Sequence, residues 1–324
     1  FTPRGKILTR ANQFEEELLV FDLYCDEDIE SLTMDQALFK RSSQEKQELS
    51  AAGNIHVSSY FPNEIPSSPT RKTHYFSGQE EVYRSLVLGT KDYVQKCGFT
   101  KVLIALSGGI DSSLVAAIAV DALGPSNVIG LSMPSVYSSE DSATDTINLA
   151  ENLGIRLETI SIQGIFDAMR DALTDQFKGT ESDITEENMQ SRIRGDLVMS
   201  MSNKFGWLVL TTGNKSEMAV GYATIYGDMA GGFAVIKDVP KVMVYDLCNH
   251  INFRSESEII PQSVINKPPS AELKPDQKDS DTLPSYDILD PILEQYVERD
   301  KSYQEIKEMG FDPDIIKGIA KPNE

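Results

Sequence analysis

Short apolar runs alternate with amphipathic stretches through most of the chain. In the clearest case, the apolar run 102–106 has the length and composition of a buried strand, and the Ala- and Leu-rich run 114–123 favours a helix. Gly124-Pro125 ends that helix. The polar heptapeptide 107–113 lies between the two runs. The pattern therefore predicts a strand, a tight polar loop and a helix.

The same alternation continues further along the chain. Three more apolar runs are predicted to be strands: 127–133, 155–160 and 207–212. Amphipathic stretches predict helices at 79–97, 139–153, 162–178, 186–205, 286–298 and 302–309. Strands that alternate with helices predict an α/β fold, a doubly wound parallel sheet with helices on both faces. Ligands bind at the carboxyl ends of the strands in such sheets, so the residues after each strand are the candidates for a site.

Three regions depart from this alternation. Residues 1–23 contain two strand-like runs, 6–9 and 17–23, which are too short to bury a core alone. Residues 24–75 are first acidic and then rich in Ser and Pro, so we expect a linker that is partly disordered before a main domain at 76–324. The proline-rich stretch 261–285 is expected to be a long loop, either functional or disordered.

Composition narrows the class of partner. The 324 residues include 30 Lys and Arg against 50 Asp and Glu, a net charge of −20, which opposes binding to nucleic acid. Three cysteines without a CxxC pair indicate neither a zinc site nor a disulfide framework. No apolar run reaches transmembrane length and no signal peptide is visible, so we expect a cytoplasmic protein without a membrane partner. Because Phe1 is not Met, we also expect a piece of a longer protein.

The heptapeptide 107–113, SGGIDSS, has the features of an anion site. Gly108 and Gly109 let the backbone turn sharply and leave its amides open, and the start of the following helix favours negative charge. Three hydroxyls add donors: Ser107, Ser112 and Ser113. Asp111 is acidic in a place built for anions, which is consistent with a divalent cation that bridges it to phosphate oxygens. An ordinary capped turn is the alternative, and the string is neither a Walker A loop nor GxGxxG.

Polar residues also follow the other predicted strands. The stretch 211–217, TTGNKSE, places Glu217 opposite Asp111, and two carboxylates from adjacent loops suit Mg²⁺ on ATP phosphates. A dipole partner at a helix start is the alternative for Glu217. The turn 133–139, MPSVYSS, either walls an adenosine pocket or is an N-capped turn.

On the predicted helix 186–205, Asn188 and Arg192 share a face and Arg194 flanks it. An amide and two arginines suit a pyrophosphate and a carboxylate, but a solvated helix with paired charges would look similar. The Gly-rich stretch 221–236 has one carboxylate, Asp228, and a tyrosine, Tyr222, that either stacks on a ring or packs in the core.

A lysine at the start of a predicted helix completes the candidate set. Lys241 could neutralise a leaving pyrophosphate, and Lys237 is close enough in sequence to take the same role.

Four motifs together resemble a known family. SGGIDSS resembles the pyrophosphate loop of the ATP pyrophosphatases that adenylate a substrate. The helix motif N-x-x-x-R-x-R at 188–194, TTGNKSE, and KPPSAELKPDQKD-x-D-x-LP-x-YD-x-LD at 267–290 resemble glutamine-dependent NAD synthetases. The resemblance covers about 79–312. It implies a ligase that amidates deamido-NAD to NAD through an adenylated carboxylate, releasing AMP and pyrophosphate, in the last step of NAD biosynthesis.

The resemblance also implies roles for individual residues. ATP, the co-substrate, would contact Ser107, Gly108, Gly109, Ile110, Asp111, Ser112, Ser113, Thr212, Lys241 and Ser270. Deamido-NAD would contact Asn188, Arg192, Arg194, Tyr222 and Asp228. Asp111 and Glu217 would bind Mg²⁺, and with Lys241 they would be the catalytic residues. The loop that carries Ser270 is implied to close over ATP and exclude water.

The front segment points to a source of ammonia. Residues 1–23 resemble the closing strands of a nitrilase-like amidase domain, which releases ammonia from glutamine. Its catalytic residues are not in this chain, so the ammonia is expected from a glutaminase domain in the full-length protein or free in solution. The resemblance also implies a homo-oligomer, a dimer or larger.

Two other functions remain in view. One is another amidotransferase of the same class, such as a GMP synthetase-like ligase. The 261–290 loop argues against this alternative. The other is a non-catalytic nucleotide-binding protein. Retention of Asp111, Glu217 and Lys241 together argues against a lost chemistry.

Overall fold

The computed structural model describes residues 7, 9–20, 75–275 and 277–320. The chain divides into two compact units, 1–76 and 77–324, and each is described by itself. The linker expected at 24–75 lies outside the described residues except for residue 75.

The described part of the first unit is a short turn with its own hydrogen bonds. The backbone amide of Asn12 donates to Glu17 (2.8 Å), and the amide of Phe76 donates to the side-chain oxygen of Gln13 (2.6 Å). Residues 7, 9 and 17–20, which the two strand-like runs contain, are not in strands. Their assignment to an amidase domain stays a prediction.

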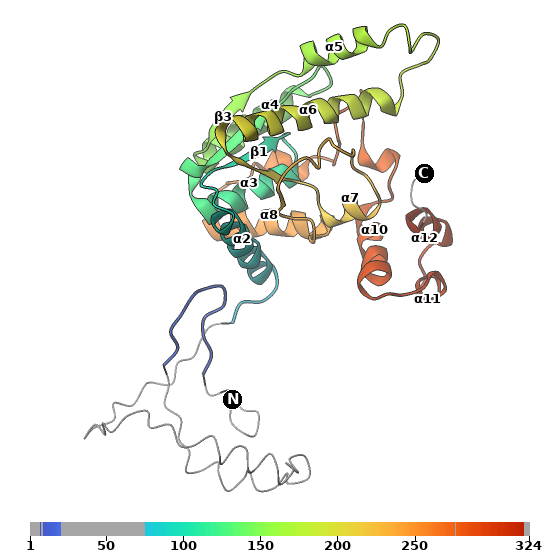
Figure 1. Cartoon of the computed structure of the whole chain (residues 1–324). Coiled ribbons are helices and arrows are strands. Elements are labelled where there is room, and N and C mark those ends of the chain that lie inside the picture. Colours follow the sequence, from blue (N-terminus) through green and yellow to red (C-terminus); the bar gives the residue numbers. More distant parts are fainter. Residues whose placement is uncertain (1–6, 8, 21–74, 276, 321–324) are drawn as a thin grey trace, which may run out of the picture. The chain divides into compact units, whose positions relative to one another are not determined.

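A parallel sheet forms the centre of the second unit (Figure 1). Its strand order is β3-β2-β1-β4-β5, and every neighbouring pair is parallel. The strands are β1 (Val102–Leu106), β2 (Val128–Ser132), β3 (Arg156–Thr159), β4 (Leu208–Thr211) and β5 (Phe233–Ala234). The parallel sheet and its first four strands confirm the prediction from the apolar runs.

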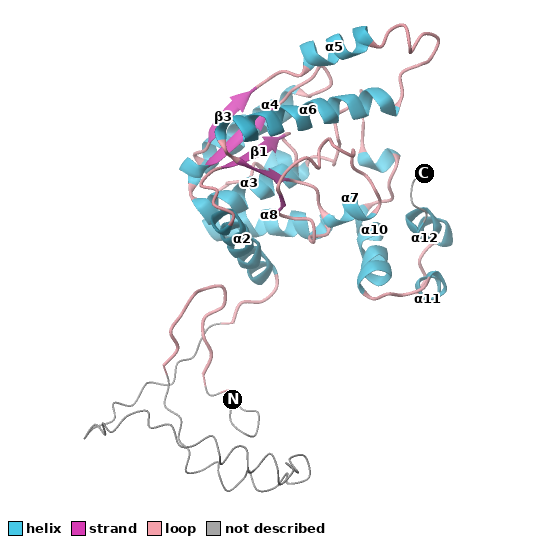
Figure 2. Cartoon of the chain, in the orientation of Figure 1, coloured by secondary structure: helices cyan, strands magenta, loops and turns pink. Residues whose placement is uncertain are grey.

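Helices connect and cover these strands (Figure 2). They are α2 (Gln79–Lys96), α3 (Ile110–Leu123), α4 (Glu140–Leu153), α5 (Gln163–Ala172), α6 (Ile184–Phe205), α7 (Lys215–Ala219), α8 (Lys241–Ser255), α9 (Gln262–Asn266), α10 (Tyr286–Leu293), α11 (Tyr303–Glu308) and α12 (Pro313–Ala320). Short 3-10 helices lie at Pro125–Asn127 and Asp279–Asp281, and a π-helix at Glu294–Glu298 follows α10. None of the helices in the described ranges is long and apolar enough to cross a membrane.

The sheet is covered on both faces because alternate residues of β1 point to opposite sides. Ile104 belongs to a buried cluster with α2, α3 and α8, whereas Leu103 belongs to a second cluster with α5 and α6. Helix α3 is buried nearly all round, and its alanines, such as Ala116 at 0% exposure, allow close packing. This is the doubly wound arrangement that the sequence predicts.

Two predicted boundaries and one predicted loop were wrong. Helix α3 begins at Ile110 rather than at 114, so the polar loop is shorter and Asp111 lies in the first helical turn. Helix α5 ends at Ala172 rather than at 178. The stretch 261–285 is not loop throughout, because Val264 and Ile265 of α9 are buried in the main core.

Candidate active site

A cavity of about 390 Å³ opens at the carboxyl ends of the strands. The loop after β1 and the loop after β4 both line it. From β1 the chain builds the sheet outward through β2 and β3, and it then returns to place β4 on the other side of β1. The gap between β1 and β4 is therefore the topological switch point, where α/β folds bind ligands. Most of the predicted residues line this cavity: Ser107, Gly108, Gly109, Ile110, Asp111, Ser112, Asn188, Arg194, Thr212, Glu217, Tyr222, Asp228, Lys241 and Ser270. Ser113 and Arg192 do not line it.

The loop after β1 is held in a fixed shape by its own serines. The Ser107 hydroxyl accepts a hydrogen bond from the Gly109 amide (3.2 Å), and the Ser112 hydroxyl donates to the Gly109 carbonyl (2.9 Å). Gly108 has φ +75°, and a Cβ there would lie 2.4 Å from the backbone oxygen of Ser142. Only glycine fits this position without displacing the start of α4.

Ser113 differs from the other serines of the motif. Its side chain is fully buried and its hydroxyl donates to the Gly109 carbonyl (2.9 Å). Because α3 begins at Ile110, Ser113 already lies in the helix and turns back along it. The structure therefore places Ser113 behind the cavity wall, where its hydrogen bond stabilises the loop.

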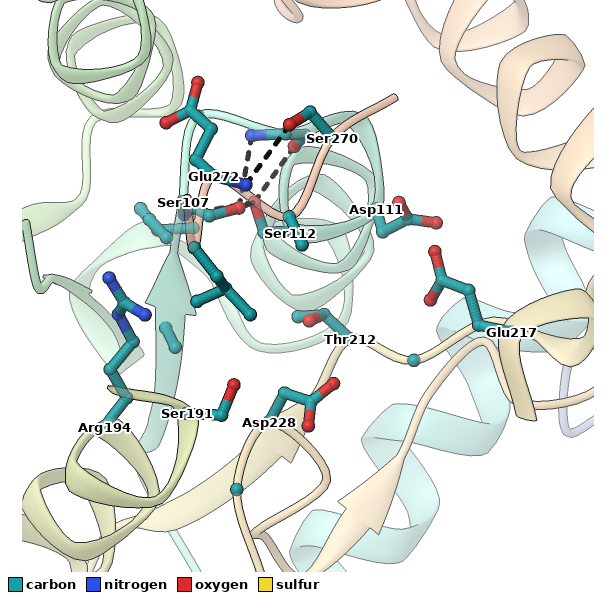
Figure 3. A pocket seen from close by; sticks show the side chains of 18 of the residues that line it. Ser107, Asp111, Ser112, Ser191, Arg194, Thr212, Glu217, Asp228, Ser270 and Glu272 are labelled. Atoms are coloured by element: carbon teal, nitrogen blue, oxygen red, sulfur yellow. Dashed lines mark hydrogen bonds between the residues drawn. The ribbon is translucent and has the colours of Figure 1, made fainter. Parts of the chain in front are cut away.

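Two acidic side chains face each other across the strand ends (Figure 3). Between them lies the ammonium of Lys241, 2.5 Å from Asp111 Oδ2 and 3.0 Å from Glu217 Oε1. Lys241 is 2% exposed, whereas Lys237 is exposed and outside the cavity. Of the two lysines that the sequence offered, the structure brings Lys241 to the carboxylates.

Burial and charge set the electrostatics of this group. Burial raises the pKa of Glu217 to about 7; the Asp111 charge adds to this rise and Lys241 opposes it. Burial alone would lower the pKa of Lys241, but Asp111 and Glu217 hold it well above its usual value. One ammonium thus faces two carboxylates, of which burial makes Glu217 costly to ionise.

The donor set fits a hard divalent cation. Magnesium takes oxygen ligands, usually one or two carboxylates completed by water and phosphate oxygens. Asp111 and Glu217 supply two carboxylates within reach of one ammonium. The described residues contain no group of three or more His, Cys, Asp or Glu that could hold a metal by themselves.

Asn214 contacts one of these carboxylates and is absent from the residues that the sequence prediction singled out. Its side chain caps α7 by accepting from the Glu217 amide (2.9 Å), and its amide group donates to Asp111 Oδ1 (2.9 Å). The cap and the carboxylate orientation therefore depend on the same side chain. The sequence signal for this role was the capping-box pattern N-x-x-E, in which the acid follows the cap residue by three positions.

A buried link fixes the first turn of α8, which carries Lys241. The Lys241 amide donates to the Ser216 hydroxyl (2.9 Å), which in turn donates to Asp290 Oδ1 (2.5 Å). The other oxygen of Asp290 accepts from the Val242 amide (2.9 Å). Asp290 of α10 thereby caps the start of α8, a role that the sequence did not reveal.

The two arginines of α6 are placed differently from the prediction. Arg194 lines the cavity, and its Nε donates to the Met133 carbonyl (3.1 Å). Burial lowers the pKa of Arg194 to about 10. Arg192 is exposed, and its Nε donates to the Ile225 carbonyl (3.2 Å).

Helix geometry explains this difference. The cavity stripe of α6 is centred near Ser191, and Arg192 as the next residue lies about 100° around the helix axis. Arg194, three residues on from Ser191, returns to the stripe. The structure places Asn188 but not Arg192 at the cavity, and a contact of Arg192 with deamido-NAD stays a prediction.

The Gly-rich loop after α7 closes another side of the cavity. The Thr224 hydroxyl donates to Asn188 (2.8 Å) and so joins the loop to α6. Within the loop, the Thr224 amide donates to Asp228 (2.8 Å). The Tyr222 hydroxyl donates to the buried Asp279 (3.2 Å), and burial raises the pKa of Tyr222. Tyr222 is thus hydrogen-bonded at the cavity rather than packed in the core.

The stretch 267–275 supplies further lining residues that the sequence prediction missed. Ser270 was expected and lines the cavity, but Lys267 and Glu272 line it as well. Their signal in the sequence was the charged residues Lys267, Glu272 and Lys274 inside a short proline-rich segment.

The sheet order and this loop chemistry define a class. A five-stranded parallel sheet carries SGGIDSS after its central strand, with paired carboxylates at the strand ends. This is the ATP pyrophosphatase type of α/β protein.

The family follows from comparison with known proteins. The sequence profile described as NAD synthase matches residues 82–323, and the chain belongs to this family. It is 48% identical over 319 residues to the glutamine-dependent NAD(+) synthetase of Thermotoga maritima, an alignment that covers 98% of this chain and 54% of that protein. The chain therefore spans about half the length of this relative.

Two solved structures are similar as well. The glutamine-dependent NAD+ synthetase of Acinetobacter baumannii in complex with ADP has a TM-score of 0.58 and 42% identity, over 79% of this chain and 45% of that one. The NH3-dependent NAD synthetase of Campylobacter jejuni in complex with the nitrate ion has a TM-score of 0.61 and 27% identity, over 76% of this chain and 93% of that one.

Proposed function

We propose that this chain is the synthetase part of a glutamine-dependent NAD synthetase and that it converts deamido-NAD to NAD with ATP and ammonia. The observation that carries the proposal is the group of Asp111, Glu217 and Lys241 beside the SGGIDSS loop. The names of the relatives support the substrates, since they are NAD synthetases that use glutamine or ammonia.

The first step is adenylation. The nicotinate carboxylate of deamido-NAD attacks the α-phosphorus of ATP, and pyrophosphate leaves. The Gly108 amide and the Ser107 hydroxyl bind phosphate oxygens, while the Ser112 hydroxyl holds the loop through the Gly109 carbonyl. The Lys241 ammonium stabilises the negative charge of the leaving group. Held by Asp111 and Glu217, Mg²⁺ would supply further charge neutralisation at these oxygens.

The second step is amide formation. Ammonia attacks the carboxyl carbon of the mixed anhydride, and AMP leaves. No covalent enzyme nucleophile is required, so the residues of this chain position the reactants and keep water out. The ammonia would come from a glutaminase domain of the full-length protein, and free ammonium would replace it in the isolated chain.

One assay tests the proposal against the two alternatives. The chain is mixed with ATP, Mg²⁺, ammonium and deamido-NAD, and NAD and pyrophosphate are measured; a parallel reaction holds xanthosine monophosphate instead. NAD formed only in the first mixture supports the proposal. Product from xanthosine monophosphate would indicate a GMP synthetase-like ligase, and ATP binding without product would indicate a non-catalytic protein.

The arginines of α6 give a prediction about substrate recognition. Arg194→Gln should raise the KM for deamido-NAD by about tenfold, because it removes a charged donor from the cavity. The matched control is Arg192→Gln, on a face of α6 that does not line the cavity. It should raise the KM for deamido-NAD by less than half of that factor. Steady-state kinetics with both variants checks this, and a larger effect in Arg192→Gln would contradict the placement of the substrate along the Ser191 stripe.

We also propose that the full-length protein is cytoplasmic, since three cysteines without a CxxC pair suit a reducing compartment, and that it is a homodimer, as the family resemblance implies. Light scattering of the purified chain measures its mass. A monomer at micromolar concentration would contradict a dimer formed by this part.

A further inference from the structure

The start of α4 receives the side chain of a distant glutamate. Glu272 accepts hydrogen bonds from the Ser139 amide (3.3 Å), the Ser139 hydroxyl (2.9 Å) and the Ser142 hydroxyl (2.8 Å). The Lys267 ammonium lies 2.7 Å from the same carboxylate. The three bonds from Ser139 and Ser142 join the 267–275 loop to the wall of the cavity at one point, and the contact with Lys267 lies within the loop.

The charge state of Glu272 suits this contact. Burial alone would raise its pKa, but hydrogen bonds from Lys267, Ser142 and Ser139 outweigh this and keep the pKa below its ordinary value. The side chain is therefore an ionised carboxylate at a helix N-terminus, where negative charge is favourable.

The backbone of Glu272 serves a second purpose. Its φ of +49° is a left-handed conformation, which costs free energy for a non-glycine residue unless contacts hold it. In this conformation its amide donates to the Ser270 hydroxyl (3.2 Å), which itself donates to the Gln277 carbonyl (2.6 Å). Figure 3 shows the link between Glu272 and Ser270. The carboxylate anchor and the placement of Ser270 thus depend on one residue.

The anchor point is also in contact with the phosphate loop. Ser142, which donates to Glu272, is the residue whose backbone leaves no space for a Cβ on Gly108. The 267–275 loop, the first turn of α4 and the SGGIDSS loop therefore form one packed unit.

Other contacts of the 267–275 loop are weaker candidates for this role. The Lys274–Glu187 pair is half-exposed on the lysine side, and exposed ion pairs contribute little. Gln190 donates to the Leu273 carbonyl (2.8 Å), a neutral hydrogen bond. Lys267 also reaches the start of α4, since its ammonium donates to the Ser139 hydroxyl (3.3 Å) and to the Ser142 hydroxyl. Of these two charged side chains, Glu272 is the one that also accepts from a backbone amide of α4, that of its N-cap Ser139.

We propose that Glu272 is a positioning residue: it holds the 267–275 loop against α4, so that Ser270 stays at the cavity wall and water is kept from the adenylate. This inference rests on the proposed function. Without the anchor, water would compete with ammonia. Its oxygen would bond to the carboxyl carbon, the bond from that carbon to the phosphate oxygen would break, AMP would leave with the electron pair, and both water protons would go to solvent.

Hydrogen–deuterium exchange tests the structural half without any turnover. The Glu272 and Leu273 amides are hydrogen-bonded in the loop. In Glu272→Ala, the peptide that contains them should exchange about tenfold faster, because a charged anchor is lost. The matched control is Glu140→Ala, which removes an exposed acid from the first turn of α4, the turn that Glu272 contacts. Unchanged exchange in Glu272→Ala, or equal acceleration in both variants, overturns the proposal.

The ratio of AMP to NAD tests the functional half. The wild-type ratio is expected to be one, and Glu272→Ala should raise it to about two or more as water consumes the adenylate. Ser142→Ala should move the ratio in the same direction, and Glu272→Gln, which keeps an acceptor, should restore part of the coupling. A ratio of one in Glu272→Ala overturns the positioning role, because a merely structural loss lowers the rate and leaves this ratio alone.

The two proposals fail in different ways. If the wild-type chain makes no NAD from deamido-NAD, the proposed function fails. The exchange experiment still decides whether Glu272 holds the loop, since it needs neither substrate nor product.

Discussion

Asp111→Asn should abolish pyrophosphate release while the fold stays intact. The amide keeps the shape and the contact with Asn214 but loses the charge that faces Lys241 and that a divalent cation would bind. Removal of a charged group that stabilises a transition state typically costs about 10²–10³-fold in rate, and we expect a loss at the upper end. A pyrophosphate-release assay with ATP and deamido-NAD measures this. Circular dichroism and thermal unfolding report the fold.

Two further variants test whether the loss of activity is specific to the paired carboxylates. Glu217→Gln should behave in the same way, because the second carboxylate has the same relation to Lys241. Asp246→Asn, an exposed acid on α8 outside the cavity, should keep wild-type activity. Full activity in Asp111→Asn or Glu217→Gln would refute the assignment of the metal site.

Gly108→Ala should both destabilise the protein and inactivate it. The added Cβ would lie 2.4 Å from the Ser142 carbonyl oxygen in a backbone conformation at φ +75°. Because backbone atoms cannot move aside as a side-chain end would, we expect a loss of about 2–4 kcal/mol in the free energy of unfolding. Denaturant unfolding followed by circular dichroism measures this loss, and NAD formation measures the activity.

The control for this substitution is Gly89→Ala. Gly89 is exposed in the middle of α2, and a Cβ there meets nothing within 4 Å. Alanine should stabilise that helix by about 0.5–1 kcal/mol. A destabilisation of similar size in both variants would show that close contact with α4 is not the reason for glycine at position 108.

The centre of the fold was predictable because several local signals agree there. The apolar run 102–106, the paired glycines and the alanine-rich run 114–123 each indicate a different element, and together they allow one order. Asp111 and Glu217 could be paired from sequence because both follow strands, and parallel strands end at the same edge. The structure brings them within reach of one ammonium.

The remaining parts depended on contacts between residues far apart in the chain. Nothing local to Glu272 indicates that Ser139 and Ser142 receive it, and the burial of Val264 depends on a core that other segments form. The position of Arg192 outside the cavity has a different cause. A shared helix face can be inferred from spacing, but which face meets the cavity is decided by tertiary packing.

The capping of α8 by Asp290 has a consequence for shortened forms of the protein. Every strand-end motif lies before residue 290, so a chain cut just ahead of that residue would retain all of them in its sequence. It would nevertheless lose the carboxylate that secures the backbone of Lys241 and Val242 through Ser216. The smallest fragment that keeps the Lys241 ammonium in register must therefore extend well past the strand-end motifs and include α10.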